Sequence, residues 1–211
     1  MVSGAVLVAM LHAEAIMTNT DSTANMASDL KSIRFAAMVD ADWRQLCIFS
    51  GLAATRRPRT SFVHPRFAPV YIIRLAQCCH NKGWRRLAKL FSLVNVLLFT
   101  LEVPSRLEIG PGLVIPHPFG TILGAGRIGA NVTIYQQVTL GATLADFSFD
   151  IESRPVVEDD VIITAGAKIL GSVRLGRGSI IGANAVVLKD VPPNSIAVGV
   201  PATIKPKRDV A

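Results

Sequence analysis

Residues 157–187 read VEDDVIITAGAKILGSVRLGRGSIIGANAVV and carry an aliphatic residue at every sixth position. The same period extends over residues 107–191. A period of six matches neither the 3.6-residue repeat of an amphipathic helix nor the alternation of a strand. It is typical of a solenoid, in which each hexad forms one side of a triangular coil and points one aliphatic side chain toward the axis. The pattern therefore predicts a parallel β-helix.

Twelve aliphatic residues share this period, and at three per coil they predict about four coils. They are Ile109, Ile115, Ile122, Ile128, Ile134, Leu140, Val157, Ile163, Ile169, Leu175, Ile181 and Val187. Two interruptions break the period. One extra residue lies between Ile115 and Ile122, and eleven lie between Leu140 and Val157. A packed coil cannot absorb extra residues, so we expect them to project outward, the longer set as a loop over residues 142–155. Such loops often form binding surfaces in repeat proteins.

Length and composition set the domain organisation. The 211 residues are 50% hydrophobic, enough for one repeat domain and a modest cap. We expect a flexible leader (1–28), a helical region (29–106), the β-helix (107–191) and a C-terminal tail (192–211). The three cysteines form no even framework and have no metal-ligand spacing, which favours a reducing, cytoplasmic setting. The sequence offers no clustered ligands for a metal.

Two helices are predicted within residues 66–101. One begins near Pro69 and stops near Asn81, and the other covers residues 84–98. The second has basic residues at one end and apolar residues along the rest, and the net charge is +7. It is either a peripheral membrane-surface helix on anionic lipid or a helical cap or oligomer contact. Neither apolar run reaches the ~20 residues of a transmembrane span. Nucleic acid is disfavoured, because no stacking aromatics interleave the basic residues.

His117 lies two residues after the inward Ile115, next to the shorter interruption. Counting by coils, its equivalent positions are Gln136, Ala165 and Ala183, which should stack along one outer edge about 4.8 Å apart. A lone histidine is more often structural than catalytic. A residue two places past an inward one faces outward, however, so core packing does not explain this one. The small residues would let a long, amide-bearing ligand approach the backbone.

Several motifs in residues 102–206 resemble the catalytic domain of serine acetyltransferases, which are left-handed β-helix hexapeptide acyltransferases. The matching pieces are IPHPFGTI (115–122), VTLG (138–141), AGAKILG (165–171), IGANAVVL (181–188), VPP (191–193) and GVPA (199–202). The resemblance implies a left-handed coil, a homotrimer and acetyl-CoA bound in the groove between neighbouring subunits.

The resemblance also assigns roles to residues. It places the catalytic base on His117 and the acid that orients it on Glu102, where the family has Asp. Backbone amides that hold the CoA arm fall on Ala165 and Ala183, and Gly141 falls near the acetyl group. Lys205, in the tail, could meet the nucleotide phosphates. Imidazole can take and return a proton near neutral pH, as acyl transfer to a hydroxyl requires.

The sequence says less about the identity of the acceptor. The family has an Asp before the catalytic histidine, where this chain has Pro116, and a second histidine in the long insertion, where it has Arg154. Arg154, which can pair with a carboxylate, and Gln136 are the predicted acceptor contacts; Arg154 could instead be a solvated loop charge. Three functions remain open: O-acetylation of L-serine or a similar small polar acceptor, O-acetylation of a sugar in exopolysaccharide, capsule or lipopolysaccharide synthesis, and a non-catalytic β-helix assembly role.

Overall fold

The computed structural model describes residues 35–144 and 150–207. The chain divides into a small unit, residues 1–37, and a large unit, residues 38–211, and the description below concerns the large unit. The predicted leader, residues 1–28, lies outside the described residues. Helices come first in the large unit. They are a helix that ends at residue 49, the short 3-10 helix η1 (Ser61–Val63), α2 (Ala68–Asn81) and α3 (Arg85–Phe99).

The two predicted helices are confirmed as α2 and α3. Pro69 lies in the first turn of α2, where its missing N–H costs no intrahelical hydrogen bond. Gly83 follows the end of α2 with a φ of 81°, a conformation that favours glycine. The C-cap of α3 is Thr100, which adopts a left-handed φ of 47°. This residue turns the chain from the helix into the first strand.

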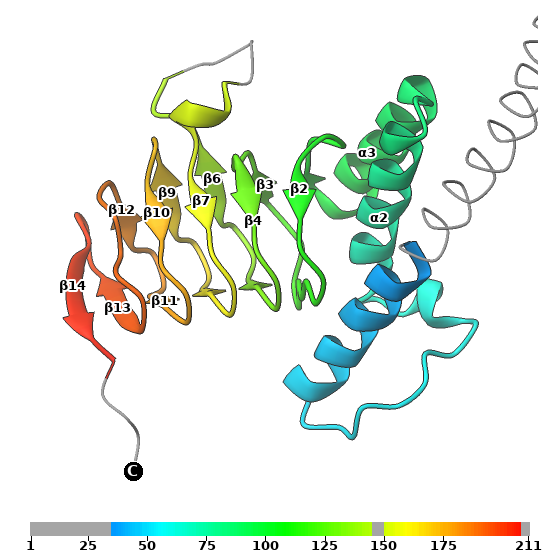
Figure 1. The fold of residues 1–211 in the computed structure, drawn as a ribbon, viewed down its shortest axis with the longest axis horizontal. Helices are drawn as coiled ribbons and strands as arrows, with labels where there is room; N and C mark the ends of the chain where they lie inside the picture. The colour runs from blue at the N-terminus through cyan, green and yellow to red at the C-terminus, as the bar shows by residue number, and fades with distance from the viewer. Residues whose placement is uncertain (1–34, 145–149, 208–211) are drawn as a thin grey trace, which may run out of the picture. The chain divides into compact units, whose positions relative to one another are not determined.

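Short strands from residue 101 onward form three sheets, one for each side of the coil (Figure 1). Sheet A contains β1 (Leu101–Glu102), β3 (Thr121–Leu123), β6 (Thr139–Gly141), β9 (Lys168–Leu170) and β12 (Val186–Val187). Sheet B contains β2 (Glu108–Ile109), β4 (Arg127–Ile128), β7 (Val156–Val157) and β10 (Arg174–Leu175). Sheet C contains β5 (Thr133–Ile134), β8 (Ile162–Ile163), β11 (Ile180–Ile181), β13 (Ser195–Val198) and β14 (Thr203–Pro206). All neighbours pair in parallel except β13 and β14.

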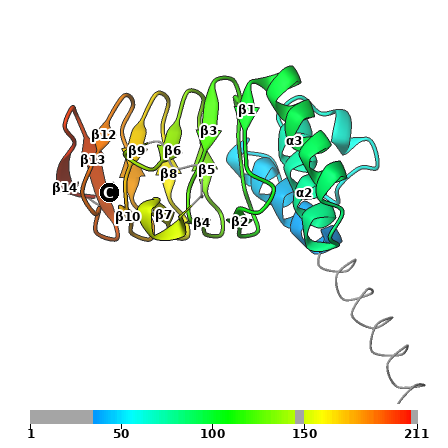
Figure 2. The ribbon, with the colours of Figure 1, turned by 90° about the horizontal axis from the view of Figure 1, so that it is seen from above.

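The coil is longer than the periodic segment. Strand β1 pairs with β3 (Figure 2), so sheet A has five strands and begins at Leu101, ahead of the expected start at residue 107. At the other end, β13 pairs with β11 and β14 turns back along it, within the segment expected to be a tail. Between β6 and β7 the described residues include η2 (Ile151–Ser153), which lies within the segment expected to form an outward loop.

The predicted inward residues are buried, with one exception. Ile122 was expected to point inward, but it is 41% exposed, and its neighbour Leu123 is fully buried. Leu123 pairs with the inward Leu140 in the register of β3 and β6. The expectation was wrong because the bulge after Ile115 holds two extra residues rather than one. Alternation along the strand then turns Leu123 inward and Ile122 outward.

A buried ion pair joins the first helix, α2 and the start of the coil. Arg74 of α2 donates to both carboxylate oxygens of Asp42, at 2.8 and 3.0 Å, and to the carbonyl of Gly110 at 2.6 Å. Asp42 also accepts hydrogen bonds from the amides of Gly112 and Leu113, both at 2.8 Å. Burial raises the pKa of the Asp42 carboxyl, and the Arg74 guanidinium and the two amides oppose that rise. The helices are therefore fixed to the first coil by polar contacts.

Most of α3 is not covered. Its buried residues are Ala88 and Asn95. The large apolar side chains along it are exposed by 37 to 72%: Leu87, Leu90, Leu93, Val96, Leu97 and Leu98. Within the described residues, no helix has the length and hydropathy needed to cross a membrane.

Candidate active site

The strand register places His117 and three predicted neighbours at equivalent positions of successive coils. Val114 forms a parallel bridge with Thr133, which pairs with Ile162 of β8, and Ile162 pairs with Ile180 of β11. Three residues after each of these positions lie the members of what we call the column: His117, Gln136, Ala165 and Ala183. The column follows sheet C, at the corner where each coil turns toward sheet A.

The column is regular except at His117. The amides of Gly166 and Asn184 donate to the carbonyls of Gln136 and Ala165, one coil earlier. The equivalent amide of Gln137 donates to Phe119 rather than to His117. The backbone around His117 therefore bulges outward from the coil. The imidazole is exposed, so it does not fill the core, and it can meet a substrate.

The three column residues on the coils after His117 have either a small side chain or an unsatisfied polar atom. Ala165 is half-buried and Ala183 is exposed. The Gln136 side-chain oxygen is buried without a hydrogen-bond partner in the described structure. Buried polar groups normally have a partner, so this amide is suited to receive an N–H or O–H from a ligand.

Glu102 is exposed at the end of β1, opposite Ile122 of β3. Among the interactions of the described residues there is no hydrogen bond or ion pair between Glu102 and His117. A nearby bond holds their two segments together, because the amide of Gly120 donates to the Thr100 hydroxyl at 2.8 Å. The structure thus brings the two segments into contact without joining the carboxylate to the imidazole.

Gly141 and Arg154 lie at another corner, where sheet A turns toward sheet B. Gly141 ends β6, and a Cβ built on it would have no atom within 4 Å. Arg154 is only 9% exposed, and its guanidinium donates to the carbonyl of Gly124 at 2.9 Å, so it is not a solvated loop charge. This contact fastens the outward loop to the coil. Within one chain, these two residues and the column are on different corners.

Lys205 is exposed on β14, at the edge of sheet C farthest from His117. It pairs with Ile196 of β13. From β14 the sheet continues through β13, β11, β8 and β5 to Val114, which at about 4.8 Å per step is roughly 24 Å. His117 and Lys205 therefore lie near opposite ends of one long side of the coil.

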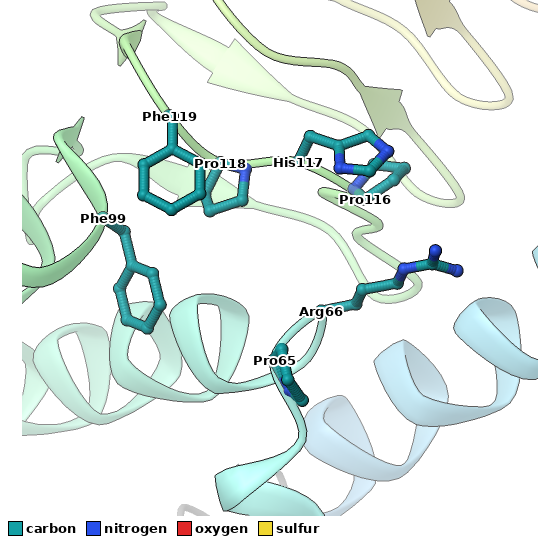
Figure 3. A pocket seen from close by; sticks show the side chains of 7 residues that line it. All are labelled: Pro65, Arg66, Phe99, Pro116, His117, Pro118 and Phe119. Carbon is teal, nitrogen blue, oxygen red and sulfur yellow. The ribbon is translucent and has the colours of Figure 1, made fainter.

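The sequence did not predict a pocket that lies beside His117 (Figure 3). Its volume is about 210 Å³. Pro65 and Arg66 come from the turn before α2, Phe99 from the end of α3, and residues 116–119 from the bulge. His117 is on its wall, and Arg66 reaches along the opposite side. These segments are far apart in the sequence, so no local motif marked the pocket. Among the described residues, no group of three or more His, Cys, Asp or Glu could hold a metal ion.

Comparison with known proteins agrees with this geometry. Residues 154–189 match the model for the family described as bacterial transferase hexapeptide (six repeats). The chain is 38% identical over 136 residues to the serine acetyltransferase of Bacillus subtilis (strain 168), which covers 64% of this chain and 61% of that protein. It is 36% identical over 151 residues to the serine acetyltransferase of Helicobacter pylori (strain J99 / ATCC 700824), which covers 71% of this chain and 86% of that protein. The chain belongs to the serine acetyltransferase family.

Solved serine acetyltransferases share the fold. The soybean enzyme complexed with serine has a TM-score of 0.71 and 30% identity, over 81% of this chain and 69% of that chain. A serine acetyltransferase in complex with CoA has a TM-score of 0.70 and 29% identity over the same shares. The predicted left-handed β-helix with an N-terminal helical region is thereby confirmed. The chain spans 61 to 62% of the length of the Bacillus and Mycobacterium tuberculosis relatives, less than two thirds.

Proposed function

We propose that this chain is an acetyl-CoA-dependent O-acetyltransferase of serine acetyltransferase type. It transfers acetyl to the hydroxyl of L-serine or a similar small polar acceptor. The main support for this proposal is the column. Its first residue is the exposed His117, and the equivalent positions of the next coils are Gln136 and two alanines. The relatives solved with CoA and with serine support the two ligands.

His117 is the general base in this proposal. Its neutral imidazole accepts the proton of the acceptor hydroxyl as that oxygen attacks the carbonyl carbon of the acetyl thioester. The new C–O bond forms, the C–S bond breaks, and the imidazolium returns its proton to the departing CoA thiolate. The products are an O-acetyl ester and CoA thiol, without an acyl-enzyme. Backbone N–H groups near the thioester stabilise the negative charge that develops on the carbonyl oxygen.

Glu102 is a positioning residue in this mechanism. A carboxylate beside a histidine fixes its tautomer and stabilises the imidazolium that forms. Both side chains are exposed on segments joined by the Gly120 to Thr100 hydrogen bond, so rotation about their side-chain bonds can bring them together. Catalytic hydrogen bonds often tighten only when substrate is bound.

A homotrimer would complete the acetyl-CoA site. Ala165 and Ala183 would hold the CoA arm through their backbone, and Gly141 would lie near the acetyl group. Because Gly141 and the column are on different corners, a ligand that contacts both needs two neighbouring chains. Lys205, at the far end of the same side, would meet the nucleotide phosphates.

The acceptor would meet Gln136 and the loop that Arg154 anchors. Gln136 has an unpartnered amide oxygen, which can accept a hydrogen bond from a hydroxyl or an ammonium. Arg154 is held at the carbonyl of Gly124, so we assign it the task of fixing the outward loop near the acceptor.

The decisive experiment measures release of CoA thiol from acetyl-CoA in the presence of acceptor. His117→Ala should lower the rate by a factor of about 10² to 10⁴, the usual contribution of a general base. His80→Ala is the control, since His80 lies on α2 outside the column and the pocket. Oligomeric state should not change in either variant. Equal activity in wild type and His117→Ala would remove His117 as the base and favour a non-catalytic assembly role.

Acetylation of a sugar is the second candidate. The pocket beside His117 is bordered by the exposed Phe119 and by Phe99, and aromatic rings can pack against the faces of a sugar ring. Buried Pro116 also stands where the family has an acid that binds the ammonium of serine. A comparison of L-serine with hexoses and nucleotide sugars in the same assay separates the two functions.

We also propose a cytoplasmic location with peripheral contact to the inner face of the membrane. Three observations support it. Cys47, Cys78 and Cys79 are free. Residues 43–101 contain ten Lys and Arg and no Asp or Glu. The apolar side chains of α3 are exposed. A basic surface with exposed apolar residues is suited to an anionic bilayer.

A further inference from the structure

We propose that the exposed face of α3 binds an anionic bilayer and that this contact raises the rate of acetyl transfer. The regulated step is the approach of Glu102 to His117. This inference rests on the proposed function, and it adds regulation of that site to the peripheral contact proposed above. Two features lead to it. One is the surface of α3, and the other is the set of hydrogen bonds that join α3 to the segments of Glu102 and His117.

α3 presents apolar side chains along most of its length and cations at its start. In residues 87–98 six large apolar side chains are exposed by 37 to 72%, and Lys89 is the only charged residue. Trp84, just before the helix, is 57% exposed. Cations lie around it and in the first two turns: Lys82, Arg85, Arg86 and Lys89. An apolar face with tryptophan and cations at its border is typical of a helix that lies in a membrane interface.

The cations at the start of α3 do not stabilise the helix. The N-terminal end of a helix is the positive end of its macrodipole, so Arg85 and Arg86 lie in an unfavourable position. Residues 43–101 contain no Asp or Glu. Within the part of the chain that the structure describes, neither arginine forms an ion pair. Their charges are therefore available to an anionic partner.

An anionic bilayer fits this surface better than a second copy of the chain. In a symmetric contact the same patch of both copies meets. The cations of α3 would then face the cap of the other copy, where residues 43–101 contain ten Lys and Arg and no acid. Like charges that face each other across an interface are unfavourable. A bilayer with anionic lipid supplies phosphate groups to the cations and an acyl boundary to the leucines.

α3 also holds the segment that carries Glu102, and it lies beside β1 (Figure 2). Thr100, its C-cap, leads directly into β1. On the other side of Glu102, the Ser92 hydroxyl of α3 donates to the carbonyl of Val103 at 3.3 Å. The backbone around Glu102 is therefore attached to α3 both before and after this residue.

The end of α3 is joined to the bulge that carries His117 as well. The Thr100 hydroxyl accepts a hydrogen bond from the amide of Gly120 at 2.8 Å, and it donates its own hydrogen to the carbonyl of Phe99, also at 2.8 Å. Thr100 thus links the helix, β1 and the bulge. Motion of α3 consequently changes the separation of Glu102 and His117.

Few contacts restrict α3 in the absence of a bilayer, since its buried residues are Ala88 and Asn95. Binding to a bilayer limits the orientation of the helix and, through the bonds on either side of Glu102, the freedom of that segment. Less conformational entropy is then lost when the carboxylate meets the His117 imidazole. The bilayer therefore favours the arrangement in which the base is oriented for proton transfer.

The assay is CoA thiol release from acetyl-CoA and L-serine without vesicles, with phosphatidylcholine vesicles, and with vesicles of phosphatidylcholine and phosphatidylglycerol. Only the anionic vesicles should raise kcat, by about fivefold or more, the lower end of the usual coupling between two sites. The KM for acetyl-CoA should not change, because the CoA arm is assigned to Ala165 and Ala183 on later coils.

Arg85→Glu and Arg86→Glu test the bilayer contact. Each should lower sedimentation with the anionic vesicles and remove most of the activation. An acid in the first turn is favourable for the macrodipole, so these losses would not arise from unfolding of the helix. Arg127→Glu is the matched control, an exposed cation of β4 on the coil, and it should keep both sedimentation and activation.

Thr100→Ala separates binding from activation. It removes the acceptor of the Gly120 amide, so this variant should sediment with the anionic vesicles as wild type does but without activation. Thr100→Ser keeps the hydroxyl and should keep the activation.

The outcomes separate this inference from the proposed function. If the anionic vesicles bind the protein without raising kcat, or if Thr100→Ala is activated as fully as wild type, the regulation is wrong, and release that requires His117 leaves the acetyltransferase assignment in place. If wild type does not sediment with the anionic vesicles, the inference is also wrong, and a change of oligomeric state in Arg85→Glu would identify a second copy as the partner. If neither L-serine nor the sugar acceptors give release that His117→Ala abolishes, with or without vesicles, the proposed function itself is wrong. Activation by anionic vesicles that needs both Arg85 and Thr100 supports both.

Discussion

In the β-helix the inward aliphatic residues are almost completely buried, whereas along α3 six aliphatic residues are exposed by 37 to 72%. The two regions also differ in how far their charged side chains are paired. Several acidic residues of the coil form ion pairs, as in the contacts of Glu158 with Arg174 and of Asp159 with Arg177, while residues 43–101 contain cations and no acid. The coil is complete within one chain, and the helical region leaves apolar and basic groups available to another surface. We infer from this difference that the coil provides most of the stability and that the cap provides an additional binding surface.

Substitution in the buried ion pair that joins the cap to the coil should have the largest effect on stability. Asp42→Ala leaves the Arg74 guanidinium buried without its carboxylate, and we expect a loss of about 3–5 kcal/mol in the free energy of unfolding. Asp40→Ala is a near neighbour that removes the exposed pair with Arg57, worth up to about 1 kcal/mol. Urea unfolding at one protein concentration measures both. Similar losses in the two variants would mean that the buried pair does not hold the cap to the coil.

A pair of matched truncations tests the two apolar faces directly. Ile163→Ala opens a cavity in the fully buried core and should cost about 2–5 kcal/mol. Leu97→Ala removes a side chain that is 72% exposed and should change stability by less than about 0.5 kcal/mol. The measurement is the same urea titration. A large loss for Leu97→Ala would show that α3 is covered, which would end the contrast between the regions.

The sequence predicted the coil well because the aliphatic residue of each hexad shows which position faces the axis. Every inward position except Ile122 is buried, and the column from His117 to Ala183 follows from counting alone. The prediction for Ile122 was wrong because the sequence shows that a bulge is present. It does not show which residues belong to the bulge and which to the next strand. Strand β1 was missed because Leu101 lies eight residues before Ile109 and therefore off the six-residue period.

The pocket could not be predicted, because it is assembled from segments that only the fold brings together. Arg66 precedes α2, Phe99 ends α3, and His117 lies on the coil. Arg154 lies in the segment expected to form the outward loop, but the sequence did not indicate its contact with a carbonyl thirty residues earlier, at Gly124. Local patterns therefore predicted elements and repeated positions, whereas contacts across the chain decided which polar groups are free.

The smallest expected effect concerns the exposed face of α3. Wild-type protein should sediment with vesicles of phosphatidylcholine containing anionic phosphatidylglycerol, and less with phosphatidylcholine alone, because residues 43–101 of the cap contain ten Lys and Arg and no Asp or Glu. Leu93→Ser and Leu97→Ser should each lower the partition coefficient about tenfold, since each loses roughly 1.5 kcal/mol of apolar burial. Leu188→Ser is the matched control, a leucine on the coil that is 53% exposed, close to the 50% of Leu93. If the α3 variants lose self-association while vesicle binding is absent in wild type, the face is a contact between copies of the chain, and the cap completes an oligomer rather than a membrane contact.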